Sequence, residues 1–376
     1  MNHEEVLLYG VGDLSFSKAD PEFTLSLVAP ILKKGDIRYG HLETSFSDRG
    51  ARQRVSPFTG GGAKPSDPPG NIVGLTYAGI DVVSYASNHT LDCGEEPVID
   101  TIEILKNNGI AMCGVGVNIN EARKPAIIER KGVKVAFLDY CSVLPKGYEA
   151  AKDRIGCAPM RVSTFYEEVD GQPGMPPKVV TVPYKEDVEA MKEDVRKAKL
   201  AADIVIMAIH WGLHMIPARL AMYEKEVAHA AIDAGVDLIF GGHPHILKGI
   251  EVYKGKVIFY SLANFAFIDA RQYPPGYKKI YPIKEMLSFT VDPDYPTYTW
   301  PPDARKTIIA KCIISNKKIE KVSFLPCMVN KQAQPEILPL SDKRSSEVID
   351  YIDWCSKDQD FNTTLTREGD EVVIKI

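Results

Sequence analysis

The stretch Phe240–Phe265, FGGHPHILKGIEVYKGKVIFYSLANF, is the most informative part of this chain. It begins at the end of an apolar run from Val236 to Phe240, which predicts a buried strand, and the two glycines that follow allow a sharp turn. His243 and His245 therefore leave the end of a strand two residues apart. Imidazole is a common protein ligand for zinc, iron and related metals, so this pair is a candidate metal-binding element.

Outward from this stretch, apolar strand-like runs alternate with amphipathic helix-like segments. Strands are expected over 6–11, 37–42, 81–85, 134–140, 204–209 and 237–240, and helices over 21–32, 71–78, 95–107, 185–201 and 218–234. This alternation predicts an α/β layered fold. The simplest organisation is one elaborated domain with three parts. These are a core over 1–268, an irregular Pro- and Tyr-rich insertion over 269–304, and C-terminal strands and a helix over 305–376 that pack on the core.

Polar side chains follow five of the predicted strands, at the point where each strand ends. They are Asp13, Glu43, the pair Asn88-His89, His210, and the pair His243 and His245. In open α/β sheets, ligand sites lie beyond the carboxyl ends of the strands. One at a time, these residues have ordinary explanations as turn residues, a solvated acid or a core histidine. Together they are the mixed oxygen and nitrogen donors that two neighbouring divalent metals need.

These blocks, in this order, resemble the calcineurin-like metallophosphoesterase superfamily. Within it they resemble the branch named for bacterial CapA and poly-γ-glutamate capsule biosynthesis. The matching blocks are Gly12-Asp13, Leu42-Glu43, Ser87–Gly94, His210–Gly212, Gly241–His245 and Tyr260–Phe265. The similarity runs from Val6 to Phe267. It implies a β-sandwich flanked by helices, in the layer order α/β/β/α, with a C-terminal extension.

The resemblance also implies a cofactor of two divalent ions, which would be manganese, iron or zinc. Glu43 would bridge the two ions. The other ligands would be Asp13 and His245 for the first ion, and Asn88, His210 and His243 for the second.

His89 would stand over the substrate without binding metal. In superfamily members that hydrolyse phosphoesters, a metal-bridging hydroxide attacks in line, and the corresponding histidine protonates the leaving oxygen or steadies the charge. Asp92, three residues further on, would orient His89.

The chain departs from the pattern of the family at several positions. Glu43 stands where most of the superfamily has Asp, a change usual in this branch. His41 stands where the branch commonly has Asn, and Ala263 where it commonly has Gly. His214 stands where an acidic residue is frequent; it is either a group that binds an anionic substrate or donates a proton, or a loop histidine with no task.

Candidate substrate-binding residues are Arg49, Arg54, His214 and Lys248. Arginine suits bidentate contacts to phosphate or carboxylate, and Lys248 follows directly on the His-Pro-His turn. For the two arginines, a solvated loop surface is the competing explanation.

Composition limits the possible partners. The chain has 376 residues, a formal net charge of −5 and seven cysteines. The net negative charge argues mildly against binding to nucleic acid.

The N-terminus lacks the pattern of a secretory signal, and no apolar run reaches the roughly 18 residues that cross a bilayer. We therefore expect a chain without membrane anchor, located in the cytoplasm, that acts on an anionic small molecule or short polymer.

The leading functional hypothesis is a dinuclear-metal hydrolase of phosphoesterase type. A rival is cleavage or transfer of an amide or γ-glutamyl bond related to poly-γ-glutamate metabolism, because a dinuclear hydroxide also attacks amides. A third hypothesis is a non-catalytic, metal-containing subunit of capsule polymer synthesis.

Overall fold

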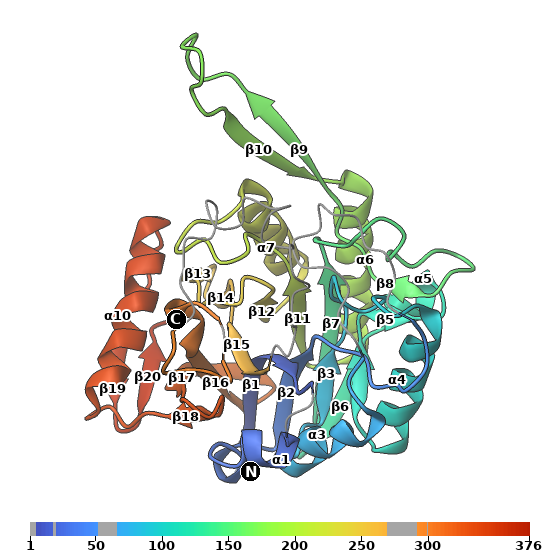
Figure 1. Ribbon diagram of the computed structural model, residues 1–376, viewed down its shortest axis with the longest axis vertical. Helices are drawn as coiled ribbons and strands as arrows, with labels where there is room; N and C mark the ends of the chain where they lie inside the picture. Colours follow the sequence, from blue (N-terminus) through green and yellow to red (C-terminus); the bar gives the residue numbers. More distant parts are fainter. Residues whose placement is uncertain (1–4, 18–19, 52–65, 269–291, 299) are drawn as a thin grey trace.

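The computed structural model describes residues 5–17, 20–51, 66–268, 292–298 and 300–376 (Figure 1). Two β-sheets pack face to face in the middle of the molecule, and helices cover the outer face of each sheet. The observed layer order, α/β/β/α, confirms the predicted fold class.

The first sheet joins both ends of the chain. Its parallel half consists of β1 (Val6–Ser15), β2 (Ile37–Leu42), β3 (Val82–Ser84) and β4 (Ala111–Cys113). On its other side β1 pairs with two strands, antiparallel β16 (Lys306–Ser315) and parallel β15 (Asn264–Phe267). The sheet continues through β17 (Lys318–Val329), β20 (Glu371–Ile374) and β19 (Leu365–Glu368), with β18 (Pro335–Ile337) beside β17. The C-terminal region therefore extends the sheet of the core.

The second sheet is parallel in its centre and antiparallel at both edges. Its strands, in order, are β13 (Ile250–Tyr253), β14 (Lys256–Phe259), β12 (Leu238–Gly242), β11 (Ile204–His210), β7 (Val133–Cys141) and β6 (Ala126–Arg130). The central strands are apolar on both faces, as expected of parallel strands covered on both sides. In β7, Val135 and Phe137 pack between the two sheets, whereas Ala136 and Leu138 face the outer helices.

Helices cover the outer faces. α1 (Pro21–Leu25), α2 (Ala29–Leu32), α3 (Ile72–Ala78) and α4 (Glu95–Asn107) pack on the first sheet. α6 (Lys185–Ala201) and α7 (Met222–Ala234) pack on the second. α10 (Lys343–Asp358) places Val348 and Ile352 in the core between the sheets. The predicted elements are confirmed in kind, with two differences. Over 21–32 two short helices replace one, and the second begins at Ala29-Pro30, since proline suits a first turn and not a helix interior. The helix predicted over 218–234 begins only at Met222, because Ala218 adopts a positive φ of 55°.

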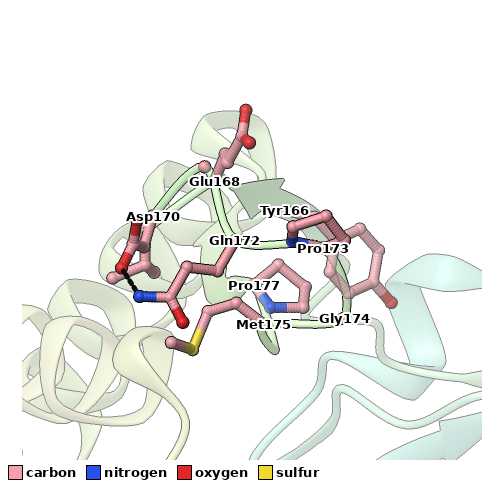
Figure 2. A pocket seen from close by; sticks show the side chains of 10 residues that line it. Tyr166, Glu168, Asp170, Gln172, Pro173, Gly174, Met175 and Pro177 are labelled. Carbon is pink, nitrogen blue, oxygen red and sulfur yellow. Dashed lines mark hydrogen bonds between the residues drawn. The ribbon is translucent and has the colours of Figure 1, made fainter.

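A hairpin that the sequence did not predict projects from the body of the molecule (Figure 1). It consists of β9 (Val162–Glu167) and β10 (Lys178–Pro183), which pair only with each other among the described strands. An open hollow at its tip is lined by residues of the hairpin alone, such as Tyr166 and Met175 (Figure 2). None of the candidate site residues lines this hollow. Most of the predicted insertion over 269–304 lies outside the described residues.

Candidate metal centre

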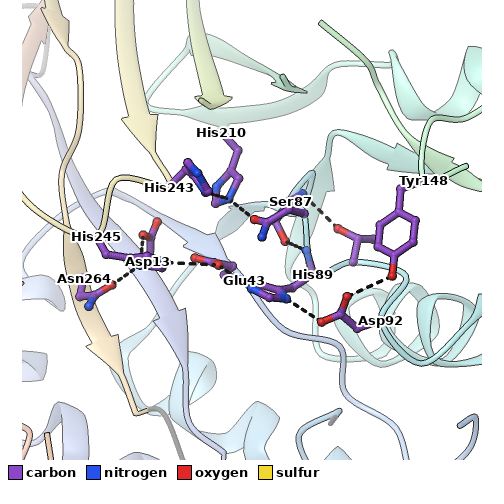
Figure 3. Close-up of polar contacts among 12 residues, drawn as sticks. Asp13, Glu43, Ser87, His89, Asp92, Tyr148, His210, His243, His245 and Asn264 are labelled. Carbon is purple, nitrogen blue, oxygen red and sulfur yellow. Dashed lines mark hydrogen bonds and ion pairs between the residues drawn. The ribbon is translucent and has the colours of Figure 1, made fainter. Parts of the chain in front are cut away.

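The carboxyl ends of parallel strands from both sheets converge on one place. Asp13 lies near the end of β1 and Glu43 directly follows β2, both in the first sheet. His210 ends β11, and His243 directly follows β12, both in the second sheet. These apolar runs stop at polar residues, so each strand delivers a donor at the same edge of the sandwich, as the sequence predicted (Figure 3).

The backbone around these donors is tightly constrained. Three residues adopt positive φ values, which are unfavourable for residues other than glycine: His243 (φ 92°), His245 (φ 57°) and Ala263 (φ 62°). A Cβ at Gly12 would lie 1.9 Å from the carbonyl oxygen of Ala263, so this position accepts only glycine. The amide of Asp13 donates to that same carbonyl at 3.0 Å. The turn before β15 is thus locked against the end of β1.

Four buried residues form the centre of the donor cluster. Ligand atoms of Asp13, His41, Glu43 and His210 all lie within 4.8 Å of one another. His245 flanks this group, with Nδ1 3.3 Å from Asp13 Oδ2 and Nε2 3.7 Å from Glu43 Oε1.

The remaining predicted ligands, Asn88 and His243, lie next to Nε2 of His210. This Nε2 atom lies 2.7 Å from Asn88 Oδ1 and 3.2 Å from His243 Nδ1. These three donors point toward one another across the two sheets. The structure therefore brings all six predicted metal ligands together.

The electrostatics of the cluster suit a divalent cation. The carboxylates of Asp13 and Glu43 are both fully buried, and burying charge is costly unless an opposite charge accompanies it. Burial, and after it the neighbouring imidazoles, hold the pKa values of His210 and His243 well below the usual value. These rings are therefore neutral at pH 7, the form in which imidazole binds metal. The donor chemistry fits manganese, iron or zinc.

His89 stands beside the cluster in a defined orientation. Its Nδ1 lies 2.6 Å from Asp92 Oδ2, and its Nε2 lies 3.7 Å from Glu43 Oε1. The hydroxyl of Tyr148 donates to Asp92 Oδ1 at 3.1 Å, and the amide of His89 donates to Ser87 Oγ at 3.0 Å. Nδ1 of His89 is thus held by the carboxylate of Asp92, while Nε2 faces the cluster of candidate metal ligands.

His214 faces the cluster too. Its ring centroid lies 5.4 Å from that of His243 and 4.9 Å from that of His245. Trp300 packs on the same group, 4.5 Å from the ring of His245 and 6.4 Å from that of His214.

The other candidate substrate-binding residues lie elsewhere. The ammonium of Lys248 is buried and donates to the carbonyls of Ile216 and Arg219, so the structure does not bring it to the cluster. The guanidinium of Arg49 pairs with Asp100 on α4, with Nε 2.9 Å from Oδ2. Arg54 lies outside the described residues.

Three residues of the site had no role assigned from the sequence. His41 was noted only as a departure from the family. Asn264 accepts a hydrogen bond from His245 Nδ1 at 2.7 Å and lies opposite Asp13 in the β1–β15 register; its block, Tyr260–Phe265, carried the signal. Trp300 carried none, because it lies within the irregular segment 269–304, where no periodic pattern indicates the path of the chain.

Comparison with curated proteins identifies relatives of partial length. The chain is 26% identical over 275 residues to the capsule biosynthesis protein CapA of Bacillus anthracis, covering 70% of this chain and 60% of that protein. It is 32% identical over 187 residues to the PGA biosynthesis protein CapA of Bacillus subtilis (strain 168), covering 50% and 42%. A probable polyglutamine synthesis accessory protein of Mycobacterium tuberculosis is 30% identical over 200 residues, covering 52% and 47%. The chain thus spans 42–60% of the length of these relatives.

Solved structures give remote likenesses. The calcineurin-like phosphoesterase YfkN of Bacillus subtilis aligns over 94% of this chain and 97% of that chain, at 12% identity and a TM-score of 0.38. The purple acid phosphatase PPD1 of yellow lupin seeds aligns over 89% and 53%, at 10% identity and a TM-score of 0.37. Within the described residues, no helix has the length and apolar character needed to span a membrane. The family described as bacterial capsule synthesis protein PGA_cap matches residues 4–269, well over half of the chain, and the chain therefore belongs to this family.

Proposed function

We propose that this chain is a metal-dependent hydrolase of phosphoesterase type that cleaves a phosphoester in an anionic small molecule or short polymer. The observation that carries the proposal is the placement of His89, which faces Glu43 while Asp92 holds its other nitrogen. A site that only stores metal has no need of an oriented imidazole beside its ligands.

In this proposal Asp13 and His245 would hold one ion, Asn88, His210 and His243 would hold a second, and Glu43 would be a ligand of both. Divalent ions bound there lower the pKa of coordinated water and polarise the bond under attack. His89 donates a proton from Nε2 to the leaving oxygen. Asp92 keeps the ring turned toward the substrate, and His214 contributes a donor for an anionic group of the substrate.

Cleavage of an amide or γ-glutamyl bond is the second candidate. It is supported by the description of the family as bacterial capsule synthesis proteins and by the names of the relatives, which refer to PGA and polyglutamine synthesis. The same metal-binding residues and the same proton donor, His89, serve the cleavage of either bond. The two candidates therefore have to be distinguished by measuring which substrates are cleaved.

Metal content and turnover, measured on one set of variants, test the proposal. We expect about two equivalents of a transition metal in the parent, with loss of metal in Asp13→Ala and His243→Ala. His89→Ala should keep its metal and lose about 10²–10⁴ of the hydrolysis rate. His229→Ala is the matched control, since His229 lies on α7 and pairs with Glu251 at 2.9 Å.

The substrate panel contains p-nitrophenyl phosphate, bis-p-nitrophenyl phosphate and γ-glutamyl-p-nitroanilide. Release of p-nitroaniline that depends on His89, without turnover of either phosphoester, would replace the first candidate by the second. A metal-loaded parent as inactive on all three substrates as His89→Ala would favour a metal-containing subunit without catalytic activity.

A further inference from the structure

His41 lies inside the donor cluster although no ligand role was assigned to it. It belongs to β2, opposite Asp13 on β1 and opposite Ser84 on β3 in the strand register. Its side chain is buried, and its ring stacks on that of His210 with a centroid distance of 4.7 Å. A ligand atom of His41 lies within 4.8 Å of ligand atoms of Asp13, Glu43 and His210. Its place is therefore as central as that of the predicted ligands.

The two nitrogens of His41 have different surroundings. Nδ1 lies 2.7 Å from the hydroxyl oxygen of Ser84, which in turn lies 2.6 Å from the hydroxyl of Tyr39. Histidines that bind metal usually donate their other ring N–H to such an acceptor, which fixes the tautomer. With Nδ1–H donating to Ser84, Nε2 carries the lone pair through which an imidazole binds a cation.

The Nε2 edge of the ring faces the donors. A Cβ built on Gly242 would lie 2.9 Å from Asp13 Oδ1, 3.6 Å from His210 Nδ1 and 3.7 Å from Cδ2 of His41, the carbon bonded to Nε2. Gly242 therefore borders the space between the side chains of Asp13, His210 and His41. Any larger residue at position 242 would fill it, which gives a physical reason for the second glycine of the Gly-Gly-His-Pro-His turn.

We propose that His41 is a further ligand of the metal centre and binds an ion through Nε2 together with Asp13 and Glu43. This inference rests on the proposed metal centre and adds a fourth imidazole to those of His210, His243 and His245. Imidazole suits zinc, iron, cobalt and nickel, whereas carboxylate, carbonyl and water suit magnesium and manganese. His41 would therefore shift the preference of the site toward nitrogen-binding metals, compared with a site that has Asn at this position.

The test counts metal-bound imidazoles directly. The parent is labelled with ¹⁵N-histidine and loaded with zinc, and ring nitrogen resonances are recorded by NMR beside those of His41→Asn and Ser84→Ala. We expect four zinc-bound rings in the parent, His41 among them with Nδ1 protonated, and three in His41→Asn. Ser84→Ala should keep four, because it removes only the acceptor. His229→Ala controls for the loss of a histidine outside the cluster.

Metal affinity supplies an independent readout, measured by competition with a chromophoric chelator. The Kd of His41→Asn for zinc should rise about tenfold or more, while that for manganese should change less than about threefold. His41→Phe keeps an aromatic ring for the stack on His210 and should weaken zinc binding as much as His41→Asn.

A parent that binds two zinc ions through only three imidazoles, with zinc affinity unchanged in His41→Asn, would overturn the ligand role and leave the proposed hydrolase standing. A parent that binds no zinc, iron or manganese would overturn both proposals. If His41→Asn does not fold, the number of zinc-bound histidine rings in the parent alone tests the ligand role of His41.

Discussion

Nδ1 of His89 lies 2.6 Å from Oδ2 of Asp92, three residues further along the same turn. The other oxygen of Asp92 accepts the hydroxyl hydrogen of Tyr148 at 3.1 Å, so the carboxylate is fixed from two sides. A carboxylate on Nδ1 holds the proton there and stabilises the ring when it is charged. The pair is therefore built to orient one imidazole relative to the donor cluster.

We predict that Asp92→Asn lowers kcat about 10–100-fold, because the amide keeps an acceptor for Nδ1–H but removes the negative charge. Metal content should stay at the level of the parent, since no donor of the cluster is changed. Steady-state hydrolysis and metal analysis of the same preparation check both points. Tyr148→Phe is the matched control and should lower kcat less than about fivefold, because it removes only the hydrogen bond from Tyr148 to Asp92. Full activity in Asp92→Asn would show that Asp92 does not position His89.

Lys248 is predicted to support the fold. Burial lowers the pKa of its ammonium and raises the pKa of nearby Glu224, and each group partly offsets the effect on the other. Lys248→Met should lower the free energy of unfolding by about 3 kcal/mol, because two carbonyls lose their donor and Glu224 loses a buried counter-charge. Urea denaturation measures this loss.

The double variant Lys248→Met/Glu224→Gln completes a cycle and should lose less stability than the sum of the two single variants, since both charges are then absent. A substrate-binding Lys248 would behave differently. Its replacement would raise KM and leave the unfolding midpoint unchanged.

The sequence predicted the donors that end strands because the apolar runs before them are unambiguous. Asp13, His210 and His243 each follow such a run, and parallel strands place their carboxyl ends at one edge. The alternation of strands and helices predicted an α/β layered fold, whereas the order of the layers, α/β/β/α, came from the resemblance to the metallophosphoesterase superfamily.

The other features of the fold and the site depend on contacts between residues that are far apart in the chain, and no local sequence pattern indicates such contacts. His41 joins the cluster through the register of β2 against β1, and a shift of one residue would turn it to the opposite face. Lys248 is buried by carbonyls about thirty residues away in the chain. The β9–β10 hairpin went unpredicted because it contributes little to the core, so its strands lack the apolar alternation that marks a half-buried sheet.

Ala263 is predicted to carry backbone strain that a glycine would relieve. Its φ of 62° costs an alanine about 1–2 kcal/mol. Ala263→Gly removes that cost and loses a buried methyl group and some chain entropy, each worth about 0.5–1 kcal/mol. The unfolding free energy should therefore stay within about 1 kcal/mol of the parent.

Ala266→Gly is the matched control, because Ala266 is equally buried in β15 and has no positive φ. It should destabilise by about 1 kcal/mol more than Ala263→Gly, as no strain is relieved. Equal losses in the two variants would argue against strain at position 263. Thermal and urea unfolding of both variants make the comparison.

Asp139 is predicted to make stability depend on pH. It is buried, and its Oδ2 accepts from the amides of Tyr85 and Ala86 at 3.0 and 2.7 Å, just before Asn88. Burial raises its pKa well above the usual 3.8, although the backbone amides act in the opposite direction. The folded state thus binds a proton more tightly than the unfolded state does. The stability contributed by this group is complete below the unfolded pKa and is lost as the pH rises through the folded pKa.

Asp139→Asn abolishes this dependence while its amide oxygen still accepts from Tyr85 and Ala86. The unfolding free energy of the variant minus that of the parent should therefore rise from about pH 4 upward and level off above the folded pKa. Urea unfolding of both proteins at several pH values between about 4 and 8 measures the difference, in which all other titrations cancel. Asp170→Asn at the exposed hairpin tip controls for the loss of one negative charge and should give a flat difference. A flat difference for Asp139→Asn as well would mean that the buried carboxylate is stabilised in its charged form, with its amide hydrogen bonds outweighing the cost of burial.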